Sequence, residues 1–281
     1  MAYAGYYINL DRSTDRRVAM ETQLGRLGVA DRYRRFAAVD GEARGAGSTS
    51  LSTGEAGCFA SHFRLLRQNR GSAAHLHVIE DDVILAGCAA RVMDQIVASP
   101  TIEDHDLLFT DMALPVDFAF CRDIRIRYQR QIKRGSDGAA TTIAMSLLPY
   151  IACTPSYLVN RRSIGRICDI LEHELEQGPK APIDVVIRCR VAEGHLRAKC
   201  LFPFITSVMP GRFDSTVLRG ARDGLSDLVV DLVRHSFFVD CDRAATLALA
   251  ERLLADNEAD FHGRMFALAF GFMTSDAFQQ P

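Results

Sequence analysis

The first half of the chain alternates short apolar runs with segments in which apolar residues recur every three or four positions. Runs rich in β-branched, aromatic and aliphatic residues predict four strands, at residues 4–10, 32–41, 74–79 and 106–112. The intervening segments predict three helices, at residues 13–28, 52–69 and 89–99. Ser52 and Glu55 have the spacing of a capping box, which marks the start of the second helix. This alternation is typical of an α/β sandwich with a mostly parallel sheet.

The second half of the chain has a more mixed pattern. Basic residues alternate with other residues over 122–134, which predicts a solvated edge strand whose charges oppose aggregation. More strands and two helices are expected between residues 140 and 205. From about residue 222 onward the pattern is helical. We therefore expect a main α/β domain over residues 1–220 and a C-terminal helical extension over residues 221–281.

Composition narrows the class of protein. The 281 residues are 48% hydrophobic and 24% charged, enough for a sizeable core, and the formal net charge of −2 argues against a nucleic-acid binder. No run of about 18 apolar residues predicts a membrane span, and the N-terminus reaches charged residues too early for a signal peptide. Eight cysteines are scattered without a CxxC pair. These features predict a reduced, cytoplasmic protein.

Three acidic residues, Glu80, Asp81 and Asp82, follow the buried-looking strand at 74–79. Ligands of open α/β sheets bind beyond the carboxyl ends of the strands, which is where these acids are expected to lie. In an extended chain Glu80 and Asp82 would point to one side, as a pair of hard oxygen ligands for Mg²⁺ or Mn²⁺. A solvated acidic turn is the alternative, because short acidic runs are common.

Six motifs together suggest a family. In chain order they are INLDRSTDRR (8–17), AVDG (38–41), GEAGCFASHFRLL (54–66), VIEDDV (78–83), SYLVNRRSIGRI (156–167) and PIDVVI (182–187). Each motif is weak alone, but their conjunction in order resembles glycosyltransferase family 25. That family includes lipopolysaccharide-core β-galactosyltransferases and collagen galactosyltransferases. The resemblance covers roughly residues 4–216, and the tail beyond about 220 is not explained by it.

The resemblance implies a GT-A-type, nucleotide-sugar-binding domain that transfers a hexose with inversion, usually galactose from UDP-galactose. Residues 1–220 would then be the catalytic domain. The acceptor would be a saccharide or glycoconjugate such as lipopolysaccharide core. Glu80, Asp81 and Asp82 would stand where related enzymes carry Asp-x-Asp. Asp82 would bind Mn²⁺ or Mg²⁺, and Glu80 would assist through water or the ribose.

Further donor-binding candidates come from two of the motifs. Asn9, Arg12 and either Arg16 or Arg17 follow the first strand and could contact the uridine or diphosphate, since guanidinium groups suit phosphates. Exposed arginines at a helix start are the alternative. On the helix at 52–69, Ser61 and His62 would form part of the wall around the donor sugar.

The same helix places Glu55, Cys58 and His62 on one face. Glu55 and His62 are two turns apart, about 10 Å, which is too far for one metal ion to bridge. A hydrolase built on Cys58 and His62 is a second hypothesis, but it has no residue to orient the base and leaves the acidic triplet without a role.

Inverting transfer also requires a carboxylate that accepts the proton of the acceptor hydroxyl. Asp184, near a predicted helix start after Pro182, is the first candidate, and Asp111, at the end of the strand predicted at 106–112, is the second. Capping of the adjacent helix or turn is the structural alternative for each residue.

Three further questions remain open at the level of sequence. A catalytically silent relative, used as a binding or scaffold subunit, is the alternative to an enzyme. The basic stretch 122–134 could attach the chain to anionic groups at the inner membrane face. Apolar stripes in the C-terminal helices could pack onto the core or join two copies in a homo-oligomer.

Overall fold

The computed structural model describes residues 3–42, 50–115, 118–135, 140–208 and 224–256. Within them, seven strands form one sheet in the order β2-β1-β3-β9-β5-β10-β8. The strands are β1 (Tyr3–Asn9), β2 (Tyr33–Ala37), β3 (His75–Glu80), β5 (Leu107–Phe109), β8 (Ser146–Pro149), β9 (Ser156–Val159) and β10 (Ala198–Phe202). Two small antiparallel pairs join β4 (Val83–Leu85) to β11 (Thr206–Val208) and β6 (Ile132–Arg134) to β7 (Ala140–Ile143).

The direction of the strands confirms the predicted fold class. β1 pairs in parallel with both β2 and β3, and β5 pairs in parallel with β10. β9 lies between β3 and β5 and is antiparallel to both, and β8 is antiparallel to β10. The sheet is therefore mixed but mostly parallel, with a reversed strand at its centre.

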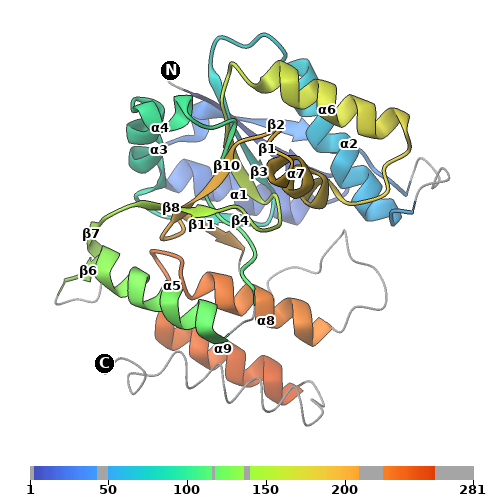
Figure 1. The fold of residues 1–281 in the computed structure, drawn as a ribbon. Helices are drawn as coiled ribbons and strands as arrows, with labels where there is room; N and C mark the ends of the chain where they lie inside the picture. Colours follow the sequence, from blue (N-terminus) through green and yellow to red (C-terminus); the bar gives the residue numbers. More distant parts are fainter. Residues whose placement is uncertain (1–2, 43–49, 116–117, 136–139, 209–223, 257–281) are drawn as a thin grey trace.

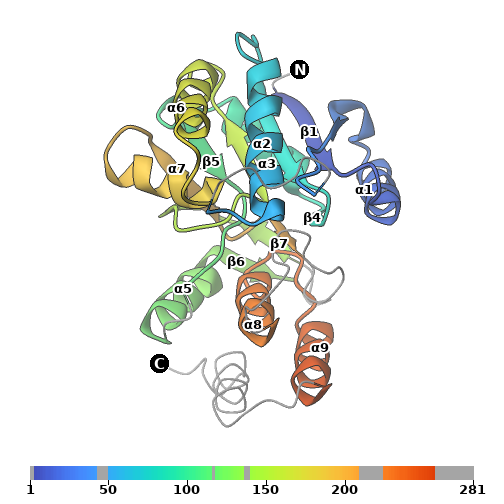
Figure 2. The same ribbon diagram turned by 90° about the vertical axis from the view of Figure 1, so that its right-hand side faces the viewer.

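Helices cover the sheet on both sides (Figures 1 and 2). One group consists of α2 (Thr53–Gln68), α6 (Ile164–Glu176) and α7 (Ile183–Ala192), and the other side carries α3 (Ala89–Val97) and α4 (Pro100–Glu103). The remaining elements are α1 (Thr14–Arg26), the short 3₁₀ turn η1 (Ala30–Arg32), α5 (Phe118–Gln131), α8 (Gly224–His235) and α9 (Arg243–Asp256). The capping box is confirmed, because the Ser52 hydroxyl accepts from the Glu55 backbone N–H and the Glu55 carboxylate accepts from that of Ser52.

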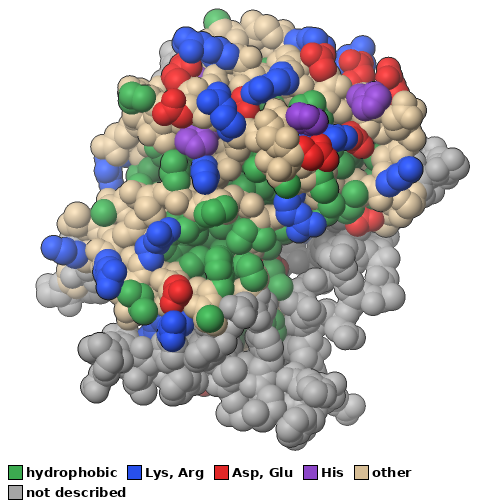
Figure 3. All heavy atoms as spheres, in the orientation of Figure 1, with side chains coloured by type: hydrophobic (Ala, Val, Ile, Leu, Met, Phe, Trp, Pro, Cys, Tyr) green, Lys and Arg blue, Asp and Glu red, His purple; other side chains and the backbone are tan. Residues whose placement is uncertain are grey.

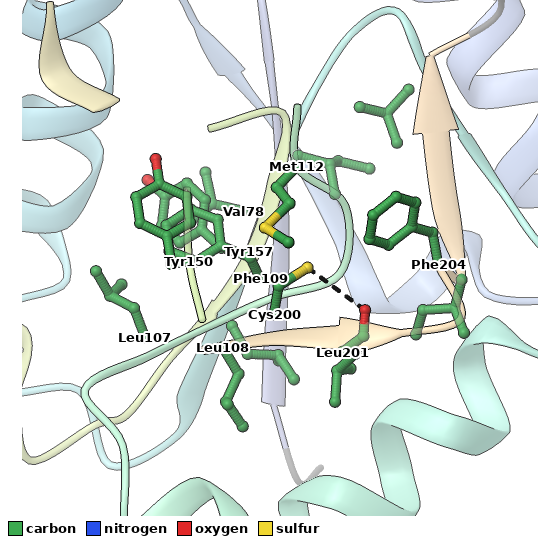
Figure 4. Packing of buried hydrophobic residues seen from close by; sticks show 14 of the residues in the cluster. Val78, Leu107, Leu108, Phe109, Met112, Tyr150, Tyr157, Cys200, Leu201 and Phe204 are labelled. Carbon is green, nitrogen blue, oxygen red and sulfur yellow. Dashed lines mark hydrogen bonds between the residues drawn. The ribbon is translucent and has the colours of Figure 1, made fainter. Parts of the chain in front are cut away.

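The core lies between the sheet and these helices. Phe109 stacks on Tyr150 at 3.8 Å between ring centroids and also contacts Tyr157, so aromatic rings from β5, β9 and the loop before β9 pack together (Figure 4). Cys200 and Leu201 of β10 are buried nearby. Burial of aromatic and aliphatic side chains of this size is the main term that stabilises a sheet with covered faces.

The helices α5, α8 and α9 lie together below the sheet (Figures 1 and 2). Val229, Leu232 and Val233 of α8 are buried in the same core as the sheet residues. The Tyr128 hydroxyl of α5 donates to the carbonyl of Phe238 at 3.1 Å. Among the described residues, the apolar stripe of α8 therefore packs onto the protein's own core. The expected domain boundary at 220 and residues 257–281 of the expected extension lie outside the described residues.

The predicted edge strand at 122–134 is wrong. Most of this segment is the helix α5, and only Ile132–Arg134 is extended. Cys121, Ile124 and Tyr128 are buried at helical spacing, whereas Ile126, which a period of two would have buried, is 40% exposed. A run in which arginine alternates with isoleucine fits both the two-residue period of a strand and the 3.6-residue period of a helix. Burial of the i, i+3 and i+7 positions favoured the helix.

Charged side chains of both signs are interspersed over one face of the molecule, with an apolar strip across its middle (Figure 3). Within the described part of the chain, no helix combines the length and apolarity that crossing a bilayer requires.

Candidate active site

A pocket opens where β1 and β3 end. Its walls are formed by residues from 8–16, 38–42, 53–62 and 80–82, so four of the six sequence motifs or their flanks meet there. The carboxyl ends of neighbouring parallel strands meet at one edge of a sheet, which explains why segments so distant in the sequence converge.

Two glycines bring the loop after β2 against α2. A Cβ atom at Gly57 would lie 2.8 Å from the carbonyl oxygen of Val39, and one at Gly41 would overlap the carbonyl of Thr53. Any larger residue would push the loop away from the helix. The AVDG and GEAG motifs are therefore explained by close packing of the pocket wall.

Arg16 organises the acidic turn. Its guanidinium group donates to Asp81 at 3.0 Å and to Asp82 at 3.3 Å, and its side chain is only 8% exposed. The amide of Asn9 donates to the other oxygen of Asp81 at 2.7 Å. Arg35 in turn donates to the Asn9 side chain at 2.8 Å. Both oxygens of Asp81 are thus satisfied, so Asp81 anchors the turn.

The extended conformation that would place Glu80 and Asp82 on one side of the chain does not continue beyond Glu80. β3 ends at Glu80, and Asp81 and Asp82 form a turn. Glu80 points toward His62, with 3.5 Å between its carboxylate and Nε2, whereas Asp82 lies beside Arg16. The turn occurs because Asn9 and Arg16 hold Asp81 on the side of α1.

Asp82 has the properties of a cation ligand. Its Oδ1 atom is buried and has no hydrogen-bond partner in the part of the chain that the structure describes, and burial together with the negative charge of Glu80 raises the pKa of its carboxyl group. An unpaired buried carboxylate oxygen costs free energy unless a cation or a donor approaches it. Asp82, with Glu80 close by, therefore fits a hard divalent cation such as Mn²⁺ or Mg²⁺.

The other expected donor-binding residues differ in position. Arg12 and Arg16 line the pocket, and Arg12 is paired with Asp40 at its rim. Arg17 does not line it, because its guanidinium group lies 2.9 Å from Glu21 on an exposed face of α1. Arg16 rather than Arg17 is thus the arginine that the fold brings to the acids.

Ser61 and His62 form part of the wall that α2 contributes. The Ser61 hydroxyl donates to the Gly57 carbonyl at 2.6 Å and accepts from the Val39 backbone at 2.8 Å, so it holds the loop after β2. The Nδ1 atom of His62 lies 2.7 Å from the hydroxyl of Tyr157, and the two rings stack. Both residues are almost fully buried.

The two candidate bases lie around Cys153, a non-glycine residue with a φ of 69°. Asp184, the second residue of α7, accepts the backbone N–H of Cys153 at 3.0 Å and that of Val185 at 2.9 Å. Its carboxylate therefore fixes the strained turn before β9 as well as the start of α7. Burial raises the pKa of the Cys153 thiol to about 12, and the charges of Asp184, Asp111 and Glu80 add to this effect.

Asp111 is fully buried, and neither of its side-chain oxygens has a hydrogen-bond partner within the described residues. Burial raises the pKa of its carboxyl group to about 7, although the positive charge of Arg234 opposes this shift. The guanidinium group of Arg234 lies 3.7 Å away. Asp111 is thus a carboxylate whose proton affinity is suited to neutral pH.

Arg234 is a residue that the sequence interpretation missed. It lies on α8, is 4% exposed, and its charge acts on Asp111 and on Asp82. The sequence feature that could have identified Arg234 is its position three residues after Asp231, within an otherwise apolar helical stripe. A charged pair in such a stripe indicates a buried polar contact rather than plain core packing.

A pocket at the carboxyl edge of a mostly parallel sheet, lined by arginines and by an acidic turn, lies where α/β proteins of the open-sheet class bind their ligands. The model of glycosyltransferase family 25 (LPS biosynthesis protein) matches residues 3–187, so the chain belongs to this family and is a glycosyltransferase by membership. A search of curated proteins finds no match.

Among solved structures, the galactosyltransferase LgtC in complex with donor and acceptor sugar analogs is similar to this chain. The match has 11% sequence identity and a TM-score of 0.34, and covers 70% of this chain and 72% of that chain. Similarity at this level adds nothing to the assignment, which comes from the family model.

Proposed function

We propose that the protein transfers a hexose, with galactose from UDP-galactose as the first candidate, to a saccharide or glycoconjugate acceptor, with inversion at the anomeric carbon. The observation that carries this proposal is the convergence of Arg12, Arg16 and the Glu80–Asp82 turn on one pocket. The choice of galactose and of an acceptor such as lipopolysaccharide core follows from family membership.

In this proposal the pocket binds the donor through complementary charge. Arg12 and Arg16 provide positive charge for a diphosphate, and the wall at 53–62 faces the sugar. Mn²⁺ or Mg²⁺ held by Asp82 and Glu80 would neutralise the charge that develops on the leaving UDP. Asn9 and Arg16 contribute by holding the turn, so that the ligand oxygens are fixed before the donor arrives.

The acceptor hydroxyl must lose its proton to a carboxylate on the opposite side of the sugar. Asp184 remains the first candidate, because it is only partly buried and comes from a different part of the fold than the acidic turn. Asp111 is the second, supported by its raised pKa and weakened by its complete burial.

Thermal stability in the presence of UDP tests the proposal most directly. The melting temperature of the wild type should rise with UDP and Mn²⁺ together, and less with either alone. Asp82→Asn should lose the Mn²⁺-dependent part of this rise while the unliganded protein melts normally. Asp169→Asn is the matched control, because Asp169 is an exposed aspartate on α6 that pairs with Arg70.

An absence of response to UDP and other nucleotides would refute the proposal, whereas EDTA-insensitive transfer by Asp82→Asn at the wild-type rate would refute only the metal role of Asp82. A screen of nucleotide sugars for slow hydrolysis then identifies the donor. Binding of UDP without hydrolysis or transfer of any nucleotide sugar would favour the silent binding subunit.

A further inference from the structure

We propose that Cys58, His62 and Glu80 form a cation site that prefers Zn²⁺. Its sulfur, nitrogen and oxygen ligands differ from the carboxylate oxygens that Asp82 would offer to Mn²⁺ or Mg²⁺. Cys58 and His62 are one turn apart on α2, and Glu80 ends the adjacent strand β3. The thiol sulfur, an imidazole nitrogen and a carboxylate oxygen all lie within 4.8 Å of one another. Glu55, which shares the helix face in the sequence pattern, is not part of this cluster.

The imidazole of His62 supplies the second observation. His62 is 1% exposed, and its Nε2 atom has no hydrogen-bond partner among the described residues although it is buried. That atom points toward Glu80 at 3.5 Å. A buried ring nitrogen that is left without a partner costs free energy, which a bound cation would remove.

The other ring nitrogen is already engaged in the way that metal ligands require. Nδ1 of His62 lies 2.7 Å from the hydroxyl of Tyr157, and the rings stack at 5.7 Å. A histidine that binds a metal through one nitrogen usually forms a hydrogen bond through the other, which fixes both the tautomer and the ring orientation. Tyr157 would therefore hold the imidazole with Nε2 directed at the metal.

The geometry suits a tetrahedral ion. Two ligands at roughly 2.1 Å from Zn²⁺ are about 3.4 Å apart in a tetrahedral site, and the observed separation between His62 and Glu80 is 3.5 Å. A set of thiolate, imidazole and carboxylate favours Zn²⁺ over Mg²⁺ and Mn²⁺, which prefer oxygen ligands. Three protein ligands beside an open pocket leave the fourth position to water or substrate.

Binding displaces the thiol proton of Cys58 into solvent, so that the sulfur binds as a thiolate and the affinity for Zn²⁺ increases with pH. Glu80 belongs to both the Zn²⁺ cluster and the acidic turn. If Glu80 assists the donor cation, as the proposed function requires, Zn²⁺ at this site would compete with donor-dependent metal binding and inhibit transfer.

The experiment uses the full chain, stripped of metal and kept reduced, without any nucleotide. Titration with Zn²⁺ against a chromophoric chelator measures affinity and stoichiometry, and Co²⁺ reports sulfur coordination through a thiolate charge-transfer band. The wild type should bind about one Zn²⁺ at this site and show the band. Cys58→Ala should lose the band and bind Zn²⁺ more than about tenfold more weakly.

Cys189→Ala is the matched control, because Cys189 is an exposed cysteine on α7. It should retain wild-type affinity and the wild-type Co²⁺ spectrum. His62→Gln should weaken binding as Cys58→Ala does, and circular dichroism establishes whether this buried substitution folds. Cys58→Ala carries the test in either case.

Wild-type Zn²⁺ affinity in Cys58→Ala would overturn the proposal, as would a Co²⁺ complex of the wild type without the thiolate band. Neither measurement uses UDP or turnover. Failure of the Zn²⁺ site is therefore distinguishable from failure of the proposed transferase, which depends on UDP binding and Asp82.

Discussion

Arg16 and Arg234 both lie beside carboxylates near the candidate site, but they differ in the distance and burial of these contacts. Arg16 donates to Asp81 and Asp82 at hydrogen-bonding distance, with Asn9 completing the set. Arg234 lies 3.7 Å from Asp111 and 3.4 Å from Asp231, and neither oxygen of Asp111 accepts a hydrogen bond within the described residues. The first cluster lines an open pocket, whereas Asp111 and Arg234 are almost completely buried.

Arg16 therefore has a positional role, whereas the role of Arg234 is electrostatic. Hydrogen bonds from Arg16 fix where the acids lie, and they are worth about 1.5–3 kcal/mol each when charge is involved. Arg234 instead favours the charged form of Asp111 against the larger effect of burial, in a dry interior where unpaired ions are expensive. The variants below test this difference, beginning with the largest expected effect.

Asp111→Ala should destabilise the protein most. It removes the fully buried carboxylate beside Arg234 and leaves Asp231, which is 33% exposed, as the remaining ion-pair partner within the described residues, and an arginine cannot release its proton to escape that cost. Removing one partner of a buried pair costs about 3–5 kcal/mol, measurable as a loss in the free energy of unfolding by urea. Asp169→Ala, which removes an exposed pair, should cost under about 1 kcal/mol. Similar losses in the two variants would contradict the assigned role of Arg234.

Asp184→Asn tests which carboxylate accepts the proton of the acceptor hydroxyl in the proposed transfer. If Asp184 is the base, turnover should fall about a hundredfold or more, because a general base of this kind contributes that much, while the affinity for UDP barely changes. A melting curve checks that the turn at Cys153 survives. Turnover within a few-fold of the wild type would remove Asp184 from this role and make Asp111→Asn the next variant to assay.

The pH dependence of stability tests the proton affinity of Asp111, and comparison with Asp111→Asn separates it from Asp82, whose carboxyl pKa is also raised by burial. Its pKa is raised to about 7 in the folded protein, so the folded state binds the proton more tightly than the unfolded state. This contribution favours folding below pH 4 and is lost as the pH rises to 7. Between pH 5 and 7 the loss is about 2 kcal/mol.

The measurement requires a reference variant. Burial lowers the pKa of His77 to about 3 and of His235 to about 4, so these residues disfavour folding as the pH falls. Comparing the wild type with Asp111→Asn across pH cancels the histidine contributions. Parallel pH curves for the two proteins would show that Asp111 does not titrate in this range.

Arg16→Lys should have the smallest of these effects. Lysine keeps the charge but cannot present two fixed donors to Asp81 and Asp82, so we expect a loss of about 1.5 kcal/mol in the free energy of unfolding. Arg17→Lys, on the exposed face of α1, should cost under about 0.5 kcal/mol. Equal losses for both would mean that the guanidinium geometry of Arg16 contributes nothing.

Local features of the sequence predicted the first half of the fold well. The capping box at Ser52 and Glu55 placed the start of α2, and the acidic triplet was expected at the carboxyl edge where Glu80 ends β3. Such signals work because caps and strand ends depend on neighbouring residues. The turn at Asp81 could not be predicted, because it depends on Asn9 and Arg16, more than sixty residues away.

Long-range packing decided the features that sequence reasoning missed. Nothing in the residues of β9 indicates that it runs against β3 and β5, since a buried strand of either direction is apolar. The helical state of 118–131 was decided by the packing of Tyr128 under residues near 238. Arg234 was not predicted, because an arginine within an amphipathic helix is usually exposed, whereas here it is buried. The boundary at 220, the metal ligands and the base stay predictions.

The reversed strand β9 has a consequence for how the chain can be shortened. It separates β3 from β5, although both precede it in the sequence. Any fragment that ends before residue 156 would leave the facing edges of β3 and β5 unpaired in the middle of the molecule. Open edges of this kind recruit other chains. During synthesis, the N-terminal half would therefore depend on later residues to close its own sheet, and truncations in this region should produce aggregates instead of smaller folded domains.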